Sequence, residues 1–401
     1  MDVQREHPRT PYSRLATLFF IQWMGLAVWV VPLTLVLNAH GYAAILPLAF
    51  ATGAVAAFVS PLFFGAMADR HLAPTRVLCW LSVGAAASLA LASWAIQSGW
   101  NAWGVLALIQ FYNLCSAPTT SLSTAITMSQ LTEPKRQFGP VRALGTIGWM
   151  AGCLLVSGLN ADASTLAGFT GAALWLGLAG FSFLLPAVEP PKSLEHLTWH
   201  ERLGLDALTL LKHPDHRVIF LCACLLNIPL AAFYPYTPVH LTDLGLLKPA
   251  AWMSLAQIAE IFTMFLMGSL LTRLRLKWIL LAGLGFALAR YGLFGLNTKA
   301  TVIAGVILHG CVYTLFFTVA QIYVNERVDV AWRTRAQALL TLMNSGVGYL
   351  VGYLVCGWWF KQCGGPAATN WPRFWSFLAV AVAAVTIYFL SAYRGRTRKH
   401  L

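Results

Sequence analysis

A single carboxylate stands in the middle of a long apolar run. Glu260 belongs to the segment SLAQIAEIFTMFL (254–266), and Gln257 lies three residues before it, on the same face if the segment is helical. Such a carboxyl group can bind and release a proton. If the helix crosses a membrane, an acid near its centre costs about 2.5–3.5 kcal/mol, so it must face a cavity or a partner. The other 13 acidic residues fall in predicted loops, tails or span ends.

Polar and aromatic residues interrupt other apolar runs at helical spacing. They are Gln22 in the first run, Arg142, Thr146 and Trp149 at i, i+4 and i+7, Arg290, and His309 and Tyr313 at i and i+4. Donors, acceptors and aromatic faces from both halves of the chain would then meet at one aqueous cavity, which is what a polar, ring-shaped solute needs.

Each of these residues also has a purely structural interpretation. Glu260 could form an ion pair with Arg290 or Arg142, and Arg142 could extend from a helix end toward the membrane surface. The remaining alternatives are packing aromatics for Trp149 and Tyr313, and interhelical hydrogen bonds for His309 and Gln22.

The composition identifies the surroundings of these residues. The chain has 401 residues, of which 58% are hydrophobic and 10% are charged, whereas soluble domains carry about 25% charged residues. We therefore predict an all-α integral membrane protein. The first apolar run lacks a small-residue cleavage site, so we interpret it as a span and not as a removable signal peptide.

Twelve segments are long and apolar enough to span a bilayer, which takes roughly 20 residues. The predicted spans are 15–37, 43–66, 76–96, 103–129, 141–160, 166–187, 217–240, 249–271, 278–296, 300–324, 336–360 and 372–393.

The basic residues predict the orientation of these spans. With the N-terminus in the cytoplasm, 22 of the 27 Lys and Arg residues fall on the cytoplasmic side, and Arg290 is left inside a span. Four fall outside, namely Lys248, Lys299, Lys361 and Arg373. This asymmetry follows the positive-inside rule. The net charge of +13 is therefore expected to face membrane lipids, not nucleic acid.

The longest hydrophilic stretch divides the spans into two sets of six. We predict an N-terminal half (1–187), a cytoplasmic linker (188–216) with a short amphipathic helix, and a C-terminal half (217–401). This is the plan of the major facilitator fold. We expect a monomer in the cell (cytoplasmic) membrane, with both termini in the cytoplasm.

The loop after the second span reads GAMADRHLAPTR (65–76). It resembles the G-x-x-x-D-R-x-x-x-R signature of the major facilitator superfamily, with one extra residue, although an ordinary basic loop is the alternative. We assign structural or gating roles to Arg290 in the ninth span and to four loop residues, Gly65, Asp69, Arg70 and Arg76.

The chain resembles the nucleoside–proton symporter family of that superfamily. The segments that carry the resemblance are RALGTIGW (142–149), AQIAEI (256–261), LARYGLFG (288–295), HGCVYTLFFTVAQIYVNERV (309–328) and RAQALLTLMNSGVG (335–348). The resemblance implies proton-coupled nucleoside uptake, with Glu260 coupling transport to protons. It implies substrate contacts from Arg142, Thr146, Gln257 and Glu260, and less directly from Trp149, His309 and Tyr313.

Two departures from the family bear on these roles. The seventh span has Ala231 and Tyr234 where the family can show Gln and Asn, so we add Tyr234 to the substrate-binding residues, as we do Gln22. In the tenth span Thr314 replaces a frequent acid, which leaves Glu260 as the carboxylate proton carrier.

The sequence lacks readable motifs of enzymes, ATP-driven proteins and metal sites. The eight cysteines are scattered, mostly within apolar runs, and no P-loop, Ser/His/Asp set or metal-type cluster is readable. We therefore expect a transporter and not an enzyme, with no cofactor and no metal. The alternatives are a transporter of sugars or small aromatic acids with the same fold, and a receptor that does not translocate.

Overall fold

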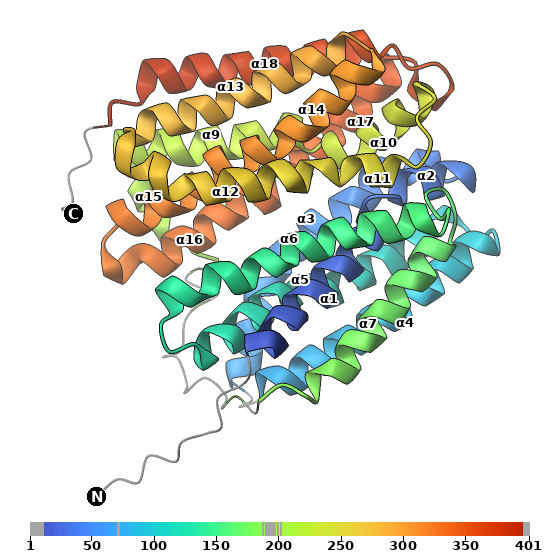
Figure 1. Cartoon of the computed structure of the whole chain (residues 1–401), viewed down its shortest axis with the longest axis horizontal. Helices are drawn as coiled ribbons and strands as arrows, with labels where there is room; N and C mark the ends of the chain where they lie inside the picture. The colour runs from blue at the N-terminus through green and yellow to red at the C-terminus, as the bar shows by residue number, and fades with distance from the viewer. Residues whose placement is uncertain are drawn as a thin grey trace, which may run out of the picture.

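The computed structural model describes residues 12–69, 73–186, 188, 198, 200 and 203–395, without the side chains of residues 60–69, 134–136 and 331. The structure is helical throughout these residues, with no strand among them (Figure 1). The helices of the first half are α1 (Tyr12–Val30), α2 (Leu33–Ala39), η1 (Ala43–Ile45), α3 (Leu46–Asp69), α4 (Pro74–Gln97), α5 (Ala102–Gln130), α6 (Pro134–Gly158) and α7 (Leu166–Ser182).

The second half follows the 3₁₀ helix η2. Its elements are η2 (Leu205–Lys212), α9 (Pro214–Leu230), α10 (Phe233–Asp243), α11 (Pro249–Met253), α12 (Leu255–Arg273), α13 (Leu276–Gly295), α14 (Lys299–Val312), η3 (Tyr313–Thr318), α15 (Val319–Arg327), η4 (Val330–Trp332), α16 (Arg333–Thr341), η5 (Leu342–Gly348), α17 (Tyr349–Gln362), η6 (Gly365–Ala367) and α18 (Trp371–Ala392). The segments η3 and η5 are π-helical.

These elements combine into twelve long segments, because several helices continue into one another. Nine of the helices among the described residues are long and apolar enough to cross a membrane, and Ala43–Val59 and Leu166–Ser182 are shorter apolar helices. The remaining segment is α5, a 29-residue helix that carries several polar side chains. The all-α membrane fold with twelve spans is thereby confirmed.

Local signals fix where several spans begin. The Asn101 side chain accepts a hydrogen bond of 2.8 Å from the Gly104 backbone amide at the start of α5. Thr298 and Thr301 form a reciprocal capping box at α14, and Asn370 caps α18. Each cap satisfies backbone amides that the first helical turn leaves without a partner.

The two halves form neighbouring bundles (Figure 1). The ends of the described chain, at α1 and α18, lie at the same side of the molecule as η2, and we call this side the linker face. The turns that follow α2 and α10, and the start of α11, lie at the opposite side, which we call the far face.

Glycines bring helices into backbone contact in both halves. A Cβ atom on Gly148 or Gly152 of α6 would collide with the carbonyl oxygen of Phe20 or Met24 in α1. In the second half, Gly348 and Gly352 at the end of η5 and in α17 lie against the carbonyl oxygens of Cys224 and Ile228 in α9. Both pairs are spaced by four residues, the small-residue spacing that lets membrane helices pack closely.

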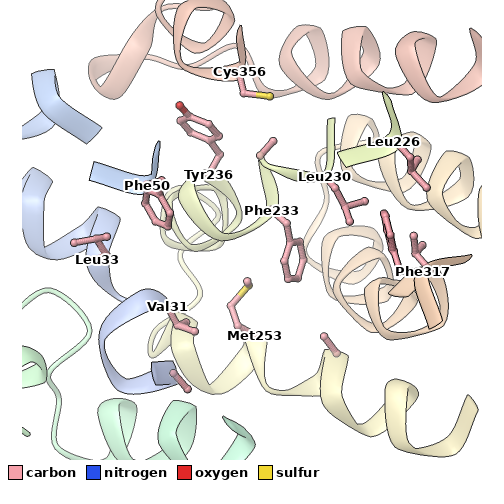
Figure 2. Close-up of a cluster of buried hydrophobic side chains, with 14 of the residues drawn as sticks. Val31, Leu33, Phe50, Leu226, Leu230, Phe233, Tyr236, Met253, Phe317 and Cys356 are labelled. Carbon is pink, nitrogen blue, oxygen red and sulfur yellow. The ribbon is translucent and has the colours of Figure 1, made fainter. Parts of the chain in front are cut away.

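The apolar core continues from one half into the other (Figure 2). Val31, Leu33 and Phe50 of the first half belong to the same buried cluster as Phe233 and Met253 of the second. A ring contact of 5.5 Å between Phe50 of α3 and Tyr353 of α17 adds to this junction.

The described part of the linker is attached to the second half. Arg335 of α16 forms an ion pair of 2.7 Å with Asp206 of η2. Gly204 has φ +70°, and a Cβ atom there would collide with the backbone of α16. Within the predicted linker the structure describes the 3₁₀ helix η2, whereas residues 189–197, 199, 201 and 202 lie outside the described residues.

The contact between α1 and α6 can be tested at Gly148. The Gly148→Ala variant should lose about 1–3 kcal/mol of stability, because the added methyl group has to displace the α1 backbone. The measurement is the thermal transition of the detergent-solubilised protein, followed by size-exclusion chromatography. The matched control is Gly180→Ala in α7, where a Cβ atom meets nothing within 4 Å. Equal transition temperatures for the two variants would contradict the contact.

Candidate functional site

The Glu260 carboxylate lies at the junction of the two halves. Its Oε1 accepts a hydrogen bond of 3.4 Å from the Thr146 hydroxyl of α6. Glu260 is half-buried, whereas Ile258, Phe262 and Phe265 on the other side of α12 are exposed by 54%, 65% and 82%. The carboxylate therefore points to the other half, and the apolar side of the helix is the one available to lipid.

The close approach of α14 shapes the same region. A Cβ atom on Gly310 would collide with the carbonyl oxygen of Ala256 and with the backbone nitrogen of Glu260. The glycine thus lets α14 pack directly on the backbone that carries the carboxylate.

Arg142 lies near the carboxylate without a direct ion pair. The guanidinium lies close to Glu260 and Tyr313, and no salt bridge joins Arg142 to Glu260 in the described part of the chain. It stands over the Trp23 ring at 3.9 Å, a cation–π distance. Trp23 directly follows Gln22 in the first span.

Aromatic rings extend from Arg142 into the second half. Trp149 lies 6.0 Å from Trp23 and 5.5 Å from Tyr234 of α10, measured between ring centroids. Tyr234 in turn lies 6.0 Å from the His309 ring. The departure at position 234 thus adds an aromatic ring to the contact between the halves.

His309 and Arg290 form a separate buried pair. His309 Nδ1 lies 2.6 Å from Nη1 of Arg290, and its ring stacks on Phe233 at 3.7 Å. Arg290 is fully buried and lies over the Tyr291 ring at 4.3 Å. Its Nε and Nη2 have no hydrogen-bond partner among the described residues. The predicted alternative of an Arg290–Glu260 ion pair is not formed.

Two predicted residues make local contacts. Gln22 is buried and donates a hydrogen bond of 2.7 Å to Thr119 of α5, so it joins helices within the first half. The Gln257 amide, oriented to donate, lies 3.2 Å from the carbonyl oxygens of Met253 and Ser254 in its own span.

The loop residues are only partly described. Gly65 and Asp69 lie in α3 without described side chains, and Arg70 lies outside the described residues. Arg76 is exposed in the first turn of α4.

A cavity of about 400 Å³ lies elsewhere, beside η2 and the start of α9. Its lining includes Lys212, His213, His216, Arg327 and Trp332. The predicted site residues do not contribute to it. No group of three potential metal ligands occurs in the described residues.

Two six-span halves with a carboxylate between them define a secondary transporter of the major facilitator fold. Comparisons with known proteins give the family. A family model described as nucleoside H⁺ symporter matches residues 11–398. The putative nucleoside transporter YegT of Escherichia coli is 33% identical, over 95% of this chain and 93% of the relative. The xanthosine permease of the same organism is 24% identical, over 94% of each chain.

A solved structure agrees with these matches at the level of the fold. The crystal structure of nucleoside transporter NupG superposes with a TM-score of 0.84 at 22% identity, over 96% of this chain and 99% of that chain. The protein described here belongs to the nucleoside H⁺ symporter family. Its relatives in that family are membrane transporters and not enzymes.

The position of Trp149 predicts a role in stacking on a flat ring. Trp149→Ala should weaken the binding of nucleosides more than that of simple pentoses, by about 0.5–1.5 kcal/mol, because an aromatic face is lost. Binding can be measured by scintillation proximity with the purified protein. Trp149→Phe, which keeps a ring, is the control. An equal loss for nucleosides and pentoses would exclude stacking on the base.

Proposed function

We propose that this protein takes up nucleosides together with protons and that Glu260 carries the proton. The observation that carries the proposal is a half-buried carboxylate that contacts Thr146 of the opposite half at 3.4 Å and lies near Arg142. The sequence matches to nucleoside transporters support the substrate class.

The geometry suggests how the charge of Glu260 is coupled to binding. An ionised carboxylate attracts the Arg142 guanidinium, whereas a protonated one no longer competes for it. Protonation therefore frees Arg142 and Thr146 to donate hydrogen bonds to a solute. A nucleoside offers ribose hydroxyls and base carbonyls as acceptors, and we propose that its aromatic base stacks on Trp149 and Tyr313.

The proposed direction of transport is inward. We place both chain ends and the linker in the cytoplasm, because most basic loops then follow the positive-inside rule. One proton moving inward contributes about 2.3 kcal/mol per 100 mV of membrane potential. We further propose the division into 1–187, 188–216 and 217–401, and a monomer surrounded by membrane lipids.

An uptake panel tests the substrate class. Cells or proteoliposomes are given radiolabelled uridine, adenosine, xylose and glucose, with and without a protonophore. Uridine or adenosine accumulation that collapses with the protonophore is the expected result. Accumulation of a sugar alone would favour the alternative substrate class.

The role of Glu260 predicts a split between coupling and binding. Glu260→Gln keeps the size of the side chain but cannot exchange a proton, so it should abolish uphill accumulation while substrate counterflow persists. Glu260→Asp should keep some coupling with an altered pH dependence. If Glu260→Gln still accumulates substrate in a protonophore-sensitive way, the proton uses a group other than Glu260.

A further inference from the structure

The first turn of α11 lacks a cap from its own segment. Lys248, at the N-cap position, makes no side-chain cap, and Pro249 occupies the first helical position. The Ala251 amide donates a hydrogen bond of 3.0 Å to the Lys248 carbonyl oxygen within its own turn. The Ala250 amide needs an acceptor from elsewhere, because the first turn of the helix offers it none. Ala250 is buried, so its amide is not left to water.

The acceptors come from the other half of the protein. The Asp162 carboxylate accepts a hydrogen bond of 2.8 Å from the Ala250 amide, and the Ser157 hydroxyl oxygen accepts one of 2.9 Å from the Ala251 amide. Ser157 also donates a 3.0 Å hydrogen bond to Asp162, which holds the two acceptors together. A negative charge at a helix N-terminus adds a favourable interaction with the helix dipole.

The backbone on each side of this contact has an uncommon conformation. Asn160 and Lys248 have φ values of 51° and 57°, and each lies two residues before a member of the contact. Three non-glycine residues in the described chain have positive φ, and two of them are here. Both turns are thus shaped so that the α6–α7 loop reaches the start of α11.

The same two spans carry the Glu260 site. Thr146 and Ser157 both lie on α6, while Ala251 and Glu260 lie on the continuous 25-residue span Pro249–Arg273. At 1.5 Å per residue, the site and the cap are separated by about 15 Å along each span. A tilt of one half that separates Ser157 from Ala251 therefore also changes the distance between Thr146 and Glu260.

We propose that Asp162 and Ser157 form a gate that closes the far face by capping α11 across the two halves. In this structure the gate is closed. Water replaces both acceptors when the halves separate, so the cap can break and re-form in each transport cycle. The gate residues touch neither Glu260 nor the aromatic rings, so the gate is distinct from the proposed binding site.

Cys153 provides a native reporter of this gate. It is fully buried in α6, close to Asp162 of its own half and to Tyr234 of the other half. The intact protein in nanodiscs is treated with a hydrophilic methanethiosulfonate, and modification of Cys153 is followed by peptide mass spectrometry. No substrate is needed, so the result does not depend on the proposed transport of nucleosides.

Loss of the gate should expose the reporter. Asp162→Ala combined with Ser157→Ala should raise the labelling rate of Cys153 by about tenfold or more, since a charge-assisted hydrogen bond and a neutral one are removed. Asp162→Asn, which keeps an acceptor oxygen, should give a smaller increase. The matched control is Ser164→Ala in the same loop, whose hydroxyl oxygen accepts a hydrogen bond from Leu166 within the first half. Labelling at the wild-type rate in the folded double variant would overturn the proposal.

A disulfide between the two halves tests the gate in the opposite way, by holding the far face closed. Ser157→Cys with Ala251→Cys should form a disulfide on oxidation, because the Ser157 side chain already contacts the backbone of residue 251. The disulfide should stop uridine uptake, and dithiothreitol should restore it, whereas oxidation should not change the uptake that each single variant shows before treatment. Undiminished uptake by the crosslinked protein would overturn the gate. Absence of uptake before oxidation, with gate-dependent labelling of Cys153, would instead contradict the proposed substrate.

Discussion

A carboxylate inside an apolar span needs polar neighbours, and for Glu260 these belong to the other half of the chain. Burying an ionisable group without partners is costly in a medium of low polarity. Thr146 and Arg142 of α6 supply a donor and a nearby positive charge. Glu260 lies in the second bundle, whereas Thr146 and Arg142 lie in the first. Movement of one half against the other therefore changes the surroundings of the carboxylate. This dependence joins the ionisation of Glu260 to the arrangement of the whole protein.

The sequence predicted the features that depend on local composition. Hydropathy gave the spans, and the cost of burying a charge singled out Glu260. The sequence did not predict contacts between distant segments, because helical periodicity indicates which residues share a helix face but not which helix that face contacts. Two such contacts had no local signal in the sequence. They are the hydrogen bond from Gln22 to Thr119, and the hydrogen bonds that Ser157 and Asp162 accept from the first turn of α11.

The glycine contacts show how the two halves repeat one packing solution. Gly148 and Gly152 meet carbonyl oxygens four residues apart in α1, as Gly348 and Gly352 do in α9. The pattern of close backbone contact is thus retained where the surrounding side chains have diverged. Gly310 applies the same principle to one half alone, since it brings α14 onto α12 at the level of Glu260.

The π-helical segment at Tyr313–Thr318 determines how the helix after it is rotated about the span axis relative to the helix before it. A π turn accommodates an additional residue relative to an α-helix, and one residue of an α-helix corresponds to a rotation of about 100°. His309 precedes the segment and Tyr323 follows it, so the two rings keep their separate partners, Arg290 and His216, through this offset. Shortening the segment by one residue would turn one of these rings away from its partner. The span therefore consists of two helices, α14 and α15, whose relative rotation is fixed by the π-helical segment that begins at Tyr313.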